Sequence, residues 1–228
     1  MPHVQPGSAL DRLAVLVVAV ATALVIVTAS IAPFLTPAFV TWEQGRADAA
    51  AWTRMAPADQ QAVTESILGD LVLWRGDFDV MLQRFQILDD AERGHMRDVR
   101  RVFTGLWVAG LAAALVLAGV GSAARSRPAL AARLRRGIGL GARGLAVGIV
   151  VAGAFALVAF DAAFEVFHRL FFAAGTYDFD PATSHLVQLF PEAFWSETAL
   201  LVGGVILLVA VVVAVLGGRR GPSTRAVT

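Results

Sequence analysis

The chain has 228 residues, of which 57% are hydrophobic and 16% are charged, and its mean hydropathy is +0.67. This composition excludes an ordinary soluble domain and indicates a small polytopic membrane protein. There is no cysteine, and all 19 basic residues are arginine, so disulfides, thiolate metal sites, a cysteine nucleophile and a catalytic lysine are excluded.

Four uncharged apolar runs predict four membrane-spanning helices, at residues 13–34, 102–120, 145–160 and 198–216. Their lengths suit a hydrocarbon core about 30 Å thick. The first run is longer than the apolar part of a secretory signal peptide, which has about 7–15 residues, so we interpret it as an uncleaved spanning helix. We expect one membrane domain over residues 1–228.

The distribution of arginine predicts the orientation. Residues 121–144 carry six arginines and no carboxylate, and three more arginines follow residue 216. The positive-inside rule assigns both stretches to the cytoplasm, as an arginine-rich loop and a C-terminal tail. Both termini are then inside, and the segments 35–101 and 161–197, which hold 17 of the 18 carboxylates, form the extracytoplasmic loops. The predicted fold is an all-α integral membrane protein, N-in and C-in, with a mainly helical extracytoplasmic cap.

The first outer segment is too long for a simple connector and should fold. Apolar residues at helical spacing predict an amphipathic cap helix, with a stripe formed by Val63, Ile67, Leu71 and Trp74. Such a stripe packs on the bundle or lies on the membrane surface.

A second helix should begin after Asp89 or Asp90, either of which can act as N-cap, and should run directly into the second span. His95 then lies two turns before the membrane. Asp98 lies three residues further along the same helical face.

The segment from Phe160 to Trp195 contains ten of the twenty aromatic residues. Asp161, Glu165 and His168 are spaced four and three residues apart, which places them on one face of a helix that continues the third span toward Gly175. After that glycine, Asp180-Pro181 predicts the start of a short helix that ends before Pro191.

Two other motifs have simpler interpretations than the functions they suggest. The sequence GLGARG at residues 139–144 matches a dinucleotide-binding pattern, but no strand precedes it, so with Gly148 it predicts close helix packing instead. Three outer histidines, His95, His168 and His185, share a face with carboxylates, but no zinc-ligand spacing joins them. We therefore predict no metal and no cofactor, and no binding of nucleic acid.

The motifs of the two outer segments, taken in their order along the chain, resemble those of a known protein family. RGHMRDVRRVF precedes the second span, and DAAFEV is followed directly by FHRLFFAAGTYDFDPATSHLVQLFPEAFW before the fourth. Together with the basic inner segment between the spans, this order resembles the bacterial lipoprotein intramolecular transacylase family. Where relatives tend to have an acidic and a small polar residue after DPAT, this chain has Ser184 and His185, so the role of the short helix and of His185 stays open.

The resemblance implies an enzyme of the bacterial plasma membrane, an acyltransferase with its active site on the extracytoplasmic face. Its partners would be membrane lipid and lipoproteins whose N-terminal cysteine carries a diacylglyceryl group. The sn-2 acyl chain would move to the α-amine of that cysteine. The family's catalytic histidines correspond to His95 and His168, one acting as general base and the other as general acid.

Around these histidines we expect Asp98, Asp161 and Glu165 to support the imidazoles. Aromatic side chains would form apolar walls for the acyl chains and exclude water. These predicted substrate-binding residues are Phe164, Phe167, Phe171, Phe172, Tyr177, Phe179, Phe190 and Trp195. Two alternatives stay open: a non-catalytic membrane protein that binds lipid or lipoprotein, and a metal-dependent membrane hydrolase.

Overall fold

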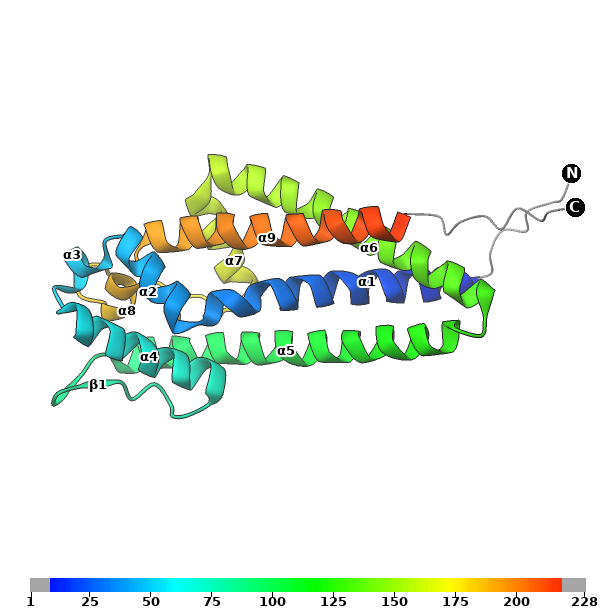
Figure 1. Cartoon of the computed structure of the whole chain (residues 1–228). Helices are drawn as coiled ribbons and strands as arrows, with labels where there is room; N and C mark the ends of the chain where they lie inside the picture. Colours follow the sequence, from blue (N-terminus) through cyan, green and yellow to red (C-terminus); the bar gives the residue numbers. More distant parts are fainter. Residues whose placement is uncertain (1–8, 219–228) are drawn as a thin grey trace, which may run out of the picture. The chain divides into compact units, whose positions relative to one another are not determined.

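The computed structural model describes residues 9–218, and these are mainly helical (Figure 1). The elements are α1 Ala9–Ile31, the 3-10 helix η1 Ala32–Leu35, α2 Pro37–Arg46, α3 Ala49–Thr53, α4 Pro57–Leu73, β1 Met81–Leu82, β2 Phe85–Gln86, α5 Asp90–Ala124, α6 Pro128–Val158, α7 Phe160–Phe171, α8 His185–Leu189 and α9 Glu192–Gly218. In this part of the chain four helices have the length and composition to cross a membrane: Ala9–Leu35, Asp90–Ala124, Pro128–Val158 and Glu192–Gly217. The prediction of an all-α protein with four spans is confirmed.

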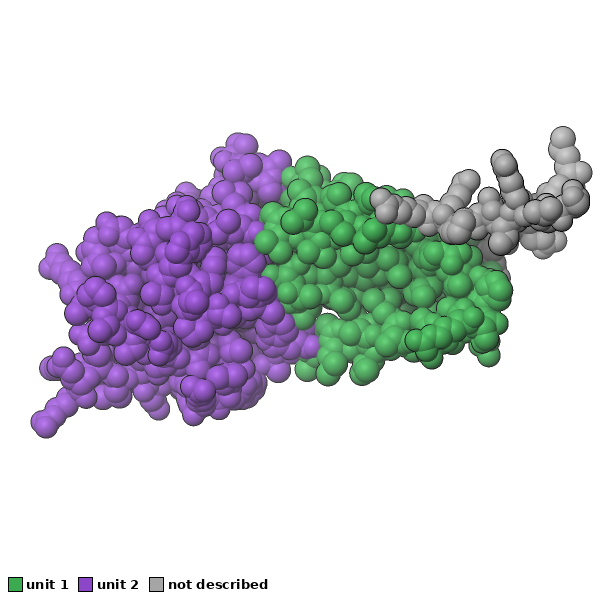
Figure 2. Space-filling view, viewed as in Figure 1, with its two compact units in different colours: residues 1–30, 108–151, 204–228 green, residues 31–107, 152–203 purple. Residues whose placement is uncertain are grey.

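The described residues divide into two compact units (Figure 2). One draws on residues 1–30, 108–151 and 204–228, and the other consists of residues 31–107 and 152–203. Both predicted histidines of the site, and the predicted cap, belong to the second unit.

Most of the stretch predicted as an inner loop, residues 121–144, is helical. Only residues 125–127 separate α5 from α6. Alanine, leucine and arginine are good helix formers, and Pro128 suits the first turn of a helix, so the apolar run that marks the third span is only the later part of α6.

The third spanning helix ends earlier than the sequence indicated. Ala159, with φ −145° and ψ 63°, separates α6 from α7, although neither proline nor glycine is present there. The two helices meet at this residue, because the Ala159 N–H donates to the Phe155 carbonyl at the end of α6 and the Ala159 carbonyl accepts from the Ala163 N–H at the start of α7.

Within the first unit, α1 packs closely against α6 at glycines. A Cβ at Gly141 would lie 2.2 Å from the Ala19 carbonyl oxygen, and one at Gly137 would lie 2.6 Å from Val18. The predicted packing role of the GLGARG segment is confirmed at Gly141, whereas Gly144 and Gly148 have open space where a Cβ would be. Gly137, just outside that segment, contributes as well.

The second unit has its own hydrophobic core beneath the predicted cap. Val63 and Ile67 of α4 are each 1% exposed, so the predicted stripe packs inward. Trp74 does not belong to it, because α4 ends at Leu73 and Trp74 adopts a left-handed conformation with φ 55°. The core joins α4 to the start of α5, to α8 and to the beginning of α9 through Val40, Leu68, Leu71, Phe78, Val80, Leu88, Met96, Leu186, Leu189, Phe190 and Phe194.

Buried polar bonds fix the short helices of this unit, where α2, α3 and α8 lie together (Figure 1). The Gln44 side chain of α2 donates to the Leu189 carbonyl of α8 and accepts from the Thr64 hydroxyl of α4, both at 3.0 Å. Helix α8 begins four residues later than the sequence indicated. Ser184, not Asp180, is its N-cap, and the Asp180 side chain instead accepts from the Ala182 N–H in the preceding turn.

Candidate active site

Two histidines from helices far apart in the sequence face each other in the second unit. The ring centroids of His95, on α5, and His168, on α7, are 6.1 Å apart, and the ring planes differ by 20°. Each residue is only 8% exposed. The structure therefore brings together the two residues that the resemblance indicated as a catalytic pair.

A backbone carbonyl orients His168. Its Nδ1 lies 2.8 Å from the carbonyl oxygen of Phe164, one helical turn earlier. Since a carbonyl only accepts, Nδ1 carries the hydrogen, and in the neutral ring Nε2 keeps its lone pair. His168 is thereby set up to accept or return a proton at Nε2.

A different backbone group lies beside His95. The Thr176 backbone interacts with the His95 ring. Because the Thr176 N–H donates to the Ala173 carbonyl, the group that faces the ring is the Thr176 carbonyl. His95 Nδ1 is buried without a partner among the described residues, which leaves Nε2 as the donor and Nδ1 as the nitrogen with a free lone pair.

Aromatic rings surround the pair on several sides. Phe164, Tyr177 and Phe172 have centroids 4.0, 4.9 and 5.5 Å from that of His168. Phe172 and Phe179 lie 4.8 and 5.7 Å from His95. The remaining predicted aromatics connect to this shell: Phe167 contacts His168, Phe171 contacts Phe167, Trp195 contacts Phe164, and Phe190 contacts Trp195. All eight belong to one aromatic cluster, defined here as the aromatic shell.

None of the three predicted supporting carboxylates hydrogen-bonds to either imidazole within the described part of the chain. Asp98 pairs with Arg101, and Glu165 pairs with Arg169 at 2.6 Å and accepts from the Tyr177 hydroxyl at 3.4 Å. Asp161 is exposed and makes no hydrogen bond or ion pair with any described residue. Backbone carbonyls lie beside the rings instead, and no pattern of residue types could have revealed them.

Sequence reasoning missed Glu92, which secures the start of α5 three residues before His95, although its spacing from Asp89 is that of a capping box. Its carboxylate is 1% exposed and accepts from the Asp89 N–H, the Ser184 hydroxyl and the Leu186 N–H. The Asp89 side chain accepts from the Glu92 N–H in return, so the two form a capping box and Asp89 is confirmed as the N-cap.

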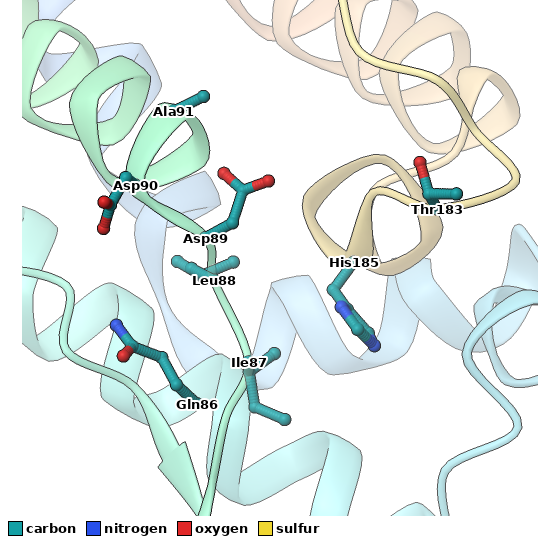
Figure 3. Close-up of a pocket in the computed structure, with 8 residues that line it drawn as sticks. All are labelled: Gln86, Ile87, Leu88, Asp89, Asp90, Ala91, Thr183 and His185. Carbon is teal, nitrogen blue, oxygen red and sulfur yellow. The ribbon is translucent and has the colours of Figure 1, made fainter.

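His185 lies apart from the pair, in a cavity of about 730 Å³ beside the start of α5 (Figure 3). The same cavity is lined by Gln86, Ile87, Leu88, Asp89, Asp90, Ala91 and Thr183. Between residues 9 and 218, no group of three or more histidine or carboxylate side chains is placed to hold a metal ion.

Four spanning helices and a buried histidine pair in an aromatic shell define the chain as an integral membrane protein with a candidate acid–base site. The model of the lipoprotein intramolecular transacylase family, Lit, matches residues 15–195. The chain belongs to this family of acyltransferases. No curated protein sequence matches it.

Solved structures agree with the family assignment. The in meso structure of Lit from Bacillus cereus has a TM-score of 0.71 at 19% identity, covering 91% of this chain and 94% of that one. Two variants of the same protein with one histidine replaced, by arginine or by alanine, give TM-scores of 0.71 and 0.72 at 17% and 18% identity. Both alignments cover 91% of this chain, and they cover 90% of the arginine variant and 92% of the alanine variant. At these identities the likeness concerns the fold.

Proposed function

We propose that this chain moves the sn-2 acyl chain of a diacylglyceryl group to the α-amine of a lipoprotein's N-terminal cysteine. The observation that carries the proposal is the pairing of His95 and His168, whose rings lie 6.1 Å apart inside the aromatic shell. Family membership supports intramolecular transacylation of lipoproteins in general, and the pair supplies the groups that the reaction needs.

The reaction requires proton transfer and no enzyme nucleophile. The amine nitrogen attacks the carbonyl carbon of the sn-2 ester, the new C–N bond forms, and the bond to the glyceryl oxygen breaks. One imidazole, neutral at the start, takes a proton from the amine, and the other, protonated at the start, gives its proton to the leaving oxygen, which becomes a hydroxyl. Transfer of the extra proton from the first ring to the second, directly or through solvent, restores the pair for the next turnover. An α-amine has a pKa of about 8, so an amine that enters as ammonium releases one further proton to solvent.

The hydrogen bonds of the two rings fit these roles. His168 Nε2 and His95 Nδ1 are the nitrogens left to exchange protons with a substrate, because the Phe164 carbonyl occupies His168 Nδ1 and His95 Nδ1 has no partner among the described residues. Both reacting groups belong to one substrate molecule, so orientation supplies much of the acceleration. The aromatic shell would contact acyl chains and exclude water, which would otherwise hydrolyse the ester.

The direct test is co-expression of the chain with a lipoprotein in bacteria that lack N-acylation of lipoproteins. Mass spectrometry of the N-terminal peptide should show an N-acyl cysteine bearing a monoacylglyceryl group, with unchanged total mass and a fragment that places one acyl chain on nitrogen. An N-terminal cysteine that keeps both acyl chains on glycerol and a free amine would contradict the proposal.

We further propose that the pair faces the extracytoplasmic side and that both termini are cytoplasmic, as the arginine distribution supports. The chain has no cysteine, so single cysteines give unambiguous labels. Ala182→Cys, in an exposed turn of the second unit, should react with an impermeant thiol reagent in whole cells, and Ser126→Cys, between α5 and α6, should react only after lysis. The reverse labelling pattern would contradict the orientation.

A further inference from the structure

A segment without regular secondary structure covers both histidines. Residues 172–179, defined here as the covering segment, follow α7, and three of their aromatic rings lie against the pair. Phe172 contacts both rings, Tyr177 lies against His168, and Phe179 lies against His95. The same segment provides the Thr176 carbonyl that faces the His95 ring.

The burial of the pair has a consequence for substrate entry. At 8% exposure, neither residue presents enough surface for a diacylglyceryl group to contact its ring. The rings of the covering segment are part of that cover, so displacement of this segment would open the pair to a substrate. When it moves, His95 loses the Thr176 carbonyl, and when it returns, the carbonyl faces the ring again.

The two ends of the covering segment are fixed, because the Phe172 N–H donates to the His168 carbonyl and Phe179 packs against the hydrophobic core. Its turn is local, since the N–H and the hydroxyl of Thr176 both bond to the Ala173 carbonyl and Gly175 adopts a φ of 81°. Tyr177 is the one side chain of the segment that hydrogen-bonds to α7 within the described chain: its hydroxyl donates to Glu165 at 3.4 Å and also interacts with Arg169. Arg169 holds Glu165 at 2.6 Å, so the acceptor of this bond is itself fixed.

We propose that Tyr177 is a positioning residue that latches the covering segment over the histidine pair through its hydrogen bond to Glu165. The latch keeps the rings of the covering segment and the Thr176 carbonyl beside the pair, so that closure over a substrate also completes the surroundings of the two imidazoles. The inference rests on the proposed function for its catalytic consequence, but the latch itself is a property of the protein without substrate.

Tyr177→Phe separates the latch from simple packing. Phenylalanine keeps the ring beside His168, whose centroid is 4.9 Å away, and removes only the hydroxyl. Glu165→Gln weakens the same bond from the other side by removing the charge of the acceptor. Thr104→Val is the matched control, because it also removes one hydroxyl hydrogen bond, to the Arg100 carbonyl of α5, outside the covering segment.

The experiment uses the purified full-length protein and two readouts that need no activity. Hydrogen exchange of residues 173–179 is measured together with the rate at which diethylpyrocarbonate modifies His95 and His168, with His185 as an internal reference. Loss of one such bond should increase both rates about 3- to 10-fold in Tyr177→Phe and Glu165→Gln, and neither in Thr104→Val. Transfer by Tyr177→Phe should show a lower kcat with little change in KM.

Rates in Tyr177→Phe equal to those of the wild-type protein would overturn the latch. An equal increase in Thr104→Val would also overturn it, since the effect would then be general loosening. Absence of transfer by the wild-type protein would contradict the proposed function, whereas faster exchange and faster modification in the two latch variants would still support the latch.

Discussion

His95→Ala and His168→Ala should each reduce N-acyl transfer by roughly 100- to 10,000-fold, the usual contribution of general acid–base catalysis. The double variant should be little worse than either single variant, because groups that act as a unit are not additive. The test is the initial rate of transfer on a diacylglyceryl peptide with a free amine, with each variant purified.

His185→Ala is the matched control for these two variants. His185 is also a histidine of the second unit, but it lines the separate cavity beside the start of α5 and not the aromatic shell. The His185→Ala variant should transfer the acyl chain at nearly the wild-type rate. Near-wild-type transfer by either His95→Ala or His168→Ala would rule out the paired mechanism, and additive partial losses would indicate two supporting residues with proton transfer carried by other groups.

The sequence predicted the spans well and their ends poorly. Hydropathy detects apolar residues, so it located all four spanning helices, but it could not show that α6 begins at Pro128 among arginines. The break at Ala159 was missed for a related reason. Alanine is a good helix former, so the residue at the bend gives no signal of a break.

For the site, too, the sequence predicted some features and missed others. The prediction that His95 and His168 belong together came from the resemblance of the surrounding motifs to the transacylase family, and the structure places the two rings 6.1 Å apart. The polar groups beside them are backbone carbonyls of Phe164 and Thr176, which every residue possesses, so no residue type marks them. Spacing on a helix favoured Glu165 as a partner of His168, whereas the nearby Arg169 and Tyr177 take that carboxylate.

Glu92 joins the two parts of the chain that place the pair. Its carboxylate accepts from the Asp89 N–H at the start of α5 and from the Ser184 hydroxyl and the Leu186 N–H at the start of α8. His95 follows on the same face of α5, three residues later. A change at Glu92 therefore acts on stability directly and on the geometry of the site through α5.

Glu92→Ala should lower the free energy of unfolding by roughly 3–5 kcal/mol, because three donors lose a charged acceptor and two of them, the Ser184 hydroxyl and the Leu186 N–H, are buried. The apparent Tm of the detergent-solubilised protein should fall by roughly 10 °C. Glu65→Ala is the control, since Glu65 accepts one exposed hydrogen bond on α4, from Gln61, and its loss should change the apparent Tm by little. Glu92→Gln should fall between the two, because an amide oxygen still accepts but the charge is gone. If Glu92→Ala unfolds at the same temperature as Glu65→Ala, then the hydrophobic core around Leu88, Leu186 and Leu189 holds α5 against α8 without the carboxylate.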